Sequence, residues 1–221
     1  LTALEKAVAM EHECDVDKQA ASYKTLNEAR ALLRRFKSAV GQFQYCYTAQ
    51  AEANRQYQSH LKTARLYISH FIQVLNLAVL RNEVRKEHKL FYGLDPEDFA
   101  VPELTGEKHI LVWGERLIEG ERERVSHGGA PIYNPTIAKV TVHYDIFKEA
   151  YREQQNYKLN TTRSQSGLDA LREEADRIIL DLWNQVETYY ADLPAEIRLN
   201  RCRAYGVVYY YRSGEKRPED D

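Results

Sequence analysis

Leu80-Arg-Asn-Glu-Val-Arg85 runs on to Phe91-Tyr-Gly-Leu94, and the same pattern returns as Leu193-Pro-Ala-Glu-Ile-Arg198 followed by Ala204-Tyr-Gly-Val207. Both copies read Leu-x-x-Glu-(Val/Ile)-Arg, then six residues, then Tyr-Gly-(Leu/Val). Every position of the second copy lies 113 residues after its counterpart. Because two matched segments at one offset are typical of a repeat, the sequence predicts an internal duplication.

The duplication extends upstream of this motif. Phe36-Lys-x-Ala39 matches Phe147-Lys-x-Ala150 at an offset of 111 residues. The change from 111 to 113 falls before Leu193, where Pro194 breaks a helix and an insertion disturbs little structure. We therefore predict pseudo-repeats at about 22–94 and 133–207, an insertion at about 95–132, and one helical domain over residues 1–221.

Apolar residues follow the period of a packed helix in four segments. They recur at alternating spacings of three and four, which predicts helices with one apolar seam rather than strands. The pattern lapses near residues 50–55 and again over 160–167, where we expect the helices to break. The sequence thus predicts an all-α fold, an elongated four-helix up-down bundle built from two αα-hairpins. The seams contain Leu26, Leu33, Phe36 and Val40; Tyr57, Leu61, Ile68 and Leu75; Val140, Tyr144 and Phe147; and Leu168, Ile178, Leu182 and Val186.

The ends of the predicted hairpins carry recognisable signals. Gly93 suits the left-handed position that ends a helix, and Asn134-Pro135 is typical of a helix start. Within the insertion, a further helix should begin near Thr105 and stop at Gly128-Gly129. Its charged stretch, 119–124, is expected to be a solvated face. Residues 207–211 form the best strand candidate and predict a short strand-like tail.

Composition argues against several classes of protein. The chain has 221 residues, with 31 Lys and Arg against 33 Asp and Glu, and dedicated nucleic-acid binders usually have a clear basic excess. The most apolar run, 71–80, is too short to span a bilayer, so we expect that the chain is not a transmembrane protein. Three scattered cysteines form no disulfide framework and slightly favour a cytoplasmic location.

Metal and cofactor chemistry finds no support in the sequence. Helical bundles that hold two metals use Glu-x-x-His pairs, and no such pair occurs among the seven histidines. No nucleophile signature is present either. We expect no catalytic residue, no metal ligand and no cofactor.

The glycine-rich loop before Asn134 is the main candidate site. A loop that leads into a helix N-terminus can bind an anion, but this one lacks the Lys-Ser/Thr of a phosphate-binding loop. The absence of these residues favours a plain connector between helices. The link between Gly93 and Asn134 is longer than neighbouring antiparallel helices need, which favours a ligand or partner site here. The candidate residues are Gly128, Gly129 and Tyr133.

The repeated Glu and Arg of the motif invite a pairing hypothesis. Residues two apart on a helix do not face each other, so each Glu should find its partner elsewhere. Glu83 would pair with Arg198, and Glu196 with Arg85, across a pseudo-twofold axis. Local ion pairs of small net value are the alternative.

Tyrosine is unusually common, with 16 residues. Tyr209, Tyr210 and Tyr211 cannot all face one way on a strand, so at least one should be exposed or meet a partner. The tail either folds against the end of the bundle or adds to the sheet of another chain.

These patterns favour a non-catalytic structural or protein-interaction role, with a protein partner or a homodimer. The alternative is a small-ligand or anion-binding protein, or an enzyme, that uses the 128–134 loop. The third possibility is nucleic-acid binding through Arg30, Arg34, Arg35 and Lys37.

Overall fold

The computed structural model describes residues 1–13 and 19–210, and it is built from helices. No strand occurs among these residues, and this confirms the predicted all-α bundle. The extra helix within 95–132 is also confirmed, as α3. A strand at 207–211 is wrong for the described part, 207–210, and Tyr211 lies outside it. The elements are α1 (Thr2–Glu13), α2 (Tyr23–Leu80), the 3-10 helix η2 (Lys86–Tyr92), α3 (Glu107–Ser126), α4 (Ile137–Tyr189) and α5 (Ala195–Ala204).

The chain forms two compact units. Unit 1 comprises residues 1–46 and 161–221, and unit 2 comprises residues 47–160. Helices α2 and α4 each contribute one part to unit 1 and the other part to unit 2. No helix of the described ranges offers a stretch long and apolar enough to cross a membrane.

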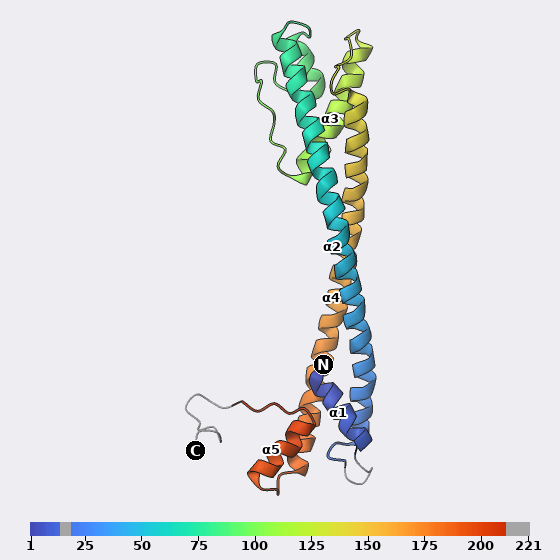
Figure 1. Ribbon diagram of the computed structural model, residues 1–221, viewed down its shortest axis with the longest axis vertical. Helices are drawn as coiled ribbons and strands as arrows, with labels where there is room; N and C mark the ends of the chain where they lie inside the picture. The colour runs from blue at the N-terminus through green and yellow to red at the C-terminus, as the bar shows by residue number, and fades with distance from the viewer. Residues whose placement is uncertain (14–18, 211–221) are drawn as a thin grey trace. The chain divides into compact units, whose positions relative to one another are not determined.

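Unit 1 packs α1 and α5 against the paired α2 and α4 (Figure 1). The pairing is antiparallel, because Thr25 of α2 contacts Asp181 whereas Arg35, further along α2, contacts Glu174. Leu4 of α1 is fully buried in the core of this unit. The core therefore draws on both ends of the chain.

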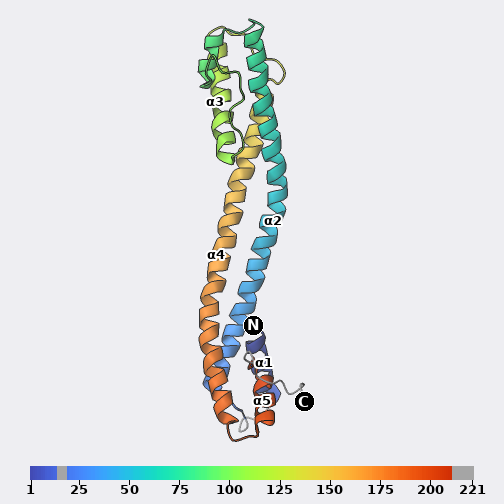
Figure 2. The same cartoon turned by 90° about the vertical axis from the view of Figure 1, so that its left-hand side faces the viewer.

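Unit 2 packs α3 and η2 against the other parts of α2 and α4 (Figure 2). Tyr144 of α4 reaches α3, where its hydroxyl donates a hydrogen bond to the carbonyl of Leu111 at 3.0 Å. Burial raises the pKa of Tyr144 to about 12, so this donor keeps its proton at neutral pH. Residues 95–106 return along α2, where Asn76 donates to the carbonyl of Phe99 at 3.0 Å.

The predicted helix breaks near 50–55 and 160–167 are wrong. Helix α2 is continuous from Tyr23 to Leu80, and α4 from Ile137 to Tyr189, so the four expected long helices are two. The apolar seam does lapse, because Cys46 is the only buried hydrophobic residue described between Phe36 and Tyr57. Gln50-Ala-Glu-Ala contains good helix formers and neither Gly nor Pro, so the backbone has no reason to stop.

The end of α2 also differs from the prediction. The helix stops at Leu80 rather than at Gly93, because Asn82 takes the left-handed conformation with φ 59°. The amide of Glu83 then donates to the carbonyl of Ala78, as in a Schellman cap. Gly93 keeps the role expected of it, at φ 70°, but it ends η2.

Candidate functional site

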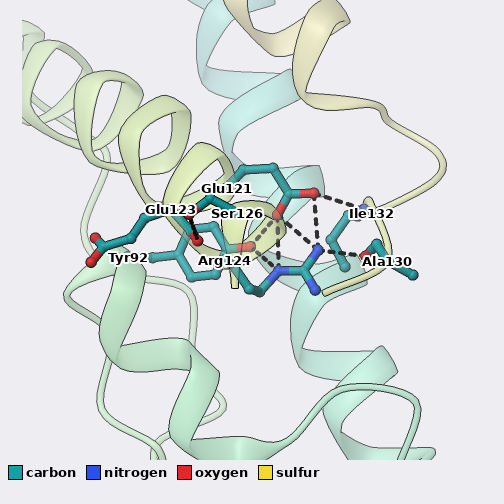
Figure 3. A network of polar contacts seen from close by, with 7 residues as sticks. All are labelled: Tyr92, Glu121, Glu123, Arg124, Ser126, Ala130 and Ile132. Atoms are coloured by element: carbon teal, nitrogen blue, oxygen red, sulfur yellow. Dashed lines mark hydrogen bonds and ion pairs between the residues drawn. The ribbon is translucent and has the colours of Figure 1, made fainter. Parts of the chain in front are cut away.

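A buried polar network lies where α3 meets η2 in unit 2 (Figure 3). Glu121 and Arg124 of α3 form an ion pair at 2.9 Å, and each is about 1% exposed. The hydroxyl of Tyr92 donates to the Glu121 carboxylate and accepts a hydrogen bond from Arg124 Nε at 2.7 Å. Burial, followed by the hydrogen bond to Glu121, raises the pKa of Tyr92, so the phenol stays protonated.

The network holds the loop that precedes α4. Glu121 Oε1 accepts the backbone amide of Ile132 at 2.7 Å, and Arg124 donates to the carbonyl of Ala130 at 2.7 Å. Gly129 is required here, because a Cβ atom would lie 2.9 Å from the Arg124 carbonyl oxygen. Gly128 adopts φ 86°, a left-handed conformation that favours glycine. The buried pair thus holds the loop through two backbone groups, the carbonyl of Ala130 and the amide of Ile132.

Three adjoining depressions lie at the end of α2 and the turn that follows it, and the loop lines two of them. Together we call the three depressions the loop surface. Val84 lines all three of them. Their volumes are about 320, 480 and 400 Å³. The turn after α2 lines all three, the loop between α3 and α4 completes the first two, and Phe99 completes the third. The residues that line them include Val74, Leu77, Leu80, Glu83, Val84, Arg85, Lys86, His88, His127, Gly128, Gly129, Pro131 and Tyr133.

The largest depression of the loop surface is the most apolar. Val74 and Leu77 of α2 line it together with Pro131 and Tyr133 of the loop. Tyr133 is 85% exposed. An aromatic ring held at the edge of an apolar depression is the kind of side chain that protein interfaces use.

The smallest depression is polar. Arg85, His88 and His127 line it together with the backbone of 128–130. The ring of Phe91 contacts His88 at 5.6 Å and His127 at 5.2 Å between ring centroids. Arg85 forms no ion pair with another described residue, so its charge is available to an anion.

The structure brings several sequence-predicted residues together on the loop surface. Gly128, Gly129 and Tyr133 come from the loop, and Glu83 and Arg85 from the turn after α2. Glu83 pairs locally with Arg81 at 2.9 Å, which is the local alternative to the pairing hypothesis.

The motif's other pair lies on α5 in unit 1. There Glu196 is exposed and Arg198 is half-buried. The cross-pairing of Glu83 with Arg198 and of Glu196 with Arg85 joins residues of different units and stays a prediction.

Tyr209 and Tyr210 of the tail belong to unit 1, whereas the loop residues belong to unit 2. Tyr209 is half-buried, and its hydroxyl donates to Glu187 at 2.9 Å. Tyr210 is 86% exposed. One ring thus folds back onto α4 and the next points to solvent, as alternation predicts, while Tyr211 lies outside the described residues.

Sequence reasoning missed Tyr92, Glu121 and Arg124. The stretch 119–124 was expected to be a solvated face because it is strongly charged. A signal was nevertheless present: Glu121 and Arg124 continue the spacing of three and four that starts at Ile110, Gly114 and Leu117, all of which are buried. Position on the seam was a better guide to burial than charge.

Other chemistries gain little support. No group of three or more His, Cys, Asp or Glu suited to a metal ion occurs in residues 1–13 and 19–210. Two of the four cations considered for nucleic-acid binding are in ion pairs, Arg35 with Glu174 and Lys37 with Glu5. Comparison with known protein families, with curated proteins and with solved structures finds no match for this chain.

Proposed function

We propose that the chain is a non-catalytic structural protein that binds a second copy of itself through the loop surface of unit 2. The observation that carries this proposal is Tyr133, which is 85% exposed beside an apolar depression. Its loop is held by the buried pair of Glu121 and Arg124. A pre-ordered loop loses little conformational entropy on binding, so an exposed ring on it can contribute strongly to affinity.

The charges of the loop surface are compatible with a second copy as the partner. Glu83 and Arg85 line the same depression, and Lys86, which lines the next one, forms an ion pair with Glu97. An isologous contact places the same patch on both subunits, so charges of both signs within the patch can pair across the twofold axis. A strongly one-signed surface would repel itself.

Sedimentation equilibrium of the full chain over a wide concentration range tests this function. We expect a monomer–dimer equilibrium that Tyr133→Ser or Leu77→Ser weakens by about tenfold or more. Leu66→Ser is the matched control: Leu66 is 65% exposed on α2 but does not line the loop surface. A monomer at every concentration, or a dimer that Tyr133→Ser leaves unchanged, overturns the proposal.

Anion binding is a second candidate, favoured by the polar depression. Arg85, His88 and His127 lie around it, and the side chains of Arg85 and His88 can donate hydrogen bonds to phosphate or carboxylate oxygens, whereas His127 Nδ1 already donates to the carbonyl of Glu123 at 2.8 Å. Thermal stabilisation by inorganic phosphate that Arg85→Gln abolishes would favour this function over self-association.

We also infer that an internal duplication underlies this architecture. The amide of Leu94 donates to the Lys89 carbonyl at 3.1 Å, and 113 residues later the amide of Val207 donates to the Cys202 carbonyl at 3.2 Å. Gly93 and Gly206 both have positive φ. The atoms nearest to a Cβ at Gly93 belong to Arg116, and those at Gly206 belong to Ala3, again 113 positions apart.

The proposed repeat is longer than the sequence pattern indicates. Leu4 and Ala7 of α1 correspond at the same offset to Leu117 and Gly120 of α3, and all four are buried. Helix α3 is then the counterpart of α1 rather than an insertion. The repeats are α1–α2–η2 and α3–α4–α5, and each unit contains helices from both.

A further inference from the structure

A polar cavity interrupts the packing of α2 against α4 within unit 2. Its volume is about 270 Å³, and the small side chains of Ala49, Ala53 and Ala150 leave the space for it. It coincides with the stretch of α2 where the apolar seam lapses. No residue that lines it belongs to the loop surface.

Gln154, a buried polar side chain that lines this cavity, has one polar atom without a hydrogen-bond partner. Gln154 is 2% exposed; its amide nitrogen donates to Asn54 Oδ1 at 3.4 Å, but its Oε1 accepts from no described residue. The hydroxyl of Tyr57, which is also 2% exposed, lies beside Glu107, and burial followed by the hydrogen bond to Glu107 raises the pKa of Tyr57. Buried polar groups are nearly always paired, so the unpaired Oε1 of Gln154 points to an occupant of the cavity.

The charged residues that line the cavity indicate the chemistry of its ligand. Glu52 and Glu153 line it, neither is ion-paired with a described residue, and no Lys or Arg is among its described lining residues. Carboxylates and an amide oxygen accept hydrogen bonds but cannot donate them. The complementary ligand is therefore a cation with several N–H donors.

We propose that this cavity binds a small organic amine, with the ammonium group held by Gln154 Oε1 and the carboxylates of Glu52 and Glu153. An organic cation is favoured over a metal ion, because these residues do not form a metal-ligating group among those described. The volume lies near the lower limit of ligand sites, which suits an alkylamine and excludes a drug-sized molecule.

Isothermal titration of the full chain with 1,4-diaminobutane tests the proposal. We expect saturable binding at one site per chain, and none for 1,4-butanediol or succinate, which have the same length but no positive charge. Gln154→Leu, or Glu52→Gln together with Glu153→Gln, should weaken binding by about tenfold or more. Gln155→Leu and Glu149→Gln alter exposed neighbours that do not line the cavity, and should leave affinity unchanged.

Thermal unfolding of each variant shows whether the variant is folded. If Gln154→Leu is folded but no longer binds the amine, the loss of binding comes from the lost contact and not from unfolding. The proposal is overturned if diaminobutane does not saturate, if butanediol binds equally well, or if the cavity variants bind like their controls. Tyr133 does not line the cavity, so Tyr133→Ser should leave amine binding unchanged. This variant therefore separates the test of amine binding from the test of dimerisation.

Discussion

At the scale of single residues, the Glu121–Arg124 pair decides whether unit 2 holds its loop. Glu121→Gln removes the negative charge and leaves Arg124 buried without a counterion. Breaking one side of a buried ion pair costs about 3–5 kcal/mol, because the remaining charge stays desolvated. We therefore expect Glu121→Gln to lower the free energy of unfolding by about that amount in urea denaturation.

Glu123→Gln is the matched control, two positions along the same helix on an exposed side chain. It should change the free energy of unfolding by no more than about 0.5 kcal/mol. In a double-mutant cycle, Arg124→Met should partly restore the stability of Glu121→Gln, because both ends of the pair are then uncharged. Equal stability of the Glu121 and Glu123 variants would show that the network does not hold the fold.

At the scale of elements, glycine sets how closely α3 approaches η2. A Cβ atom at Gly120 would lie 2.6 Å from the carbonyl oxygen of Phe91, and that backbone cannot move without shifting η2. We expect Gly120→Ala to destabilise the protein by about 1–3 kcal/mol in thermal or urea unfolding, as overpacking does.

Gly41→Ala provides the opposite expectation. Gly41 lies inside α2 with nothing within 4 Å of its Cβ position, so alanine meets no clash. It should stabilise the protein by about 0.5–1 kcal/mol, because glycine is the poorer helix former. If Gly120→Ala proved as harmless as Gly41→Ala, the close packing of α3 on η2 would be wrong.

The same elements show how far sequence could predict the fold. Tyr57, Leu61, Ile68 and Leu75 occupy the buried seam that their spacing predicts, because period alone assigns the buried face of a long helix. The prediction of a helix break near 50–55 was wrong, because the apolar seam can lapse beside a polar cavity as well as at a turn.

The candidate site was predicted only in part, for similar reasons. Gly128 and Gly129 are identified by their backbone requirements, which are local and therefore visible in sequence. The burial of Glu121 depends on Tyr92, 29 residues away, and local pattern carries no information on such a partner.

At the scale of the whole chain, two separate cores indicate two centres of stability. Leu4 belongs to the core of unit 1 and Leu117 to the core of unit 2, and both are fully buried. Truncating either side chain creates a cavity that costs about 2–5 kcal/mol. Hydrogen exchange reports local opening, so the loss should be largest in the unit that contains the substitution.

Leu117→Ala should therefore accelerate amide exchange over 61–75 and 140–147 more than over 26–36 and 178–186, and Leu4→Ala should do the reverse. The comparison also bears on the proposed repeat, because equivalent positions in the two repeats should give losses of similar size. Mass spectrometry of peptides from both variants measures the effect. A uniform increase along α2 and α4 would instead mean that the chain opens as one unit, and that each continuous helix couples the two cores too tightly for either to weaken alone.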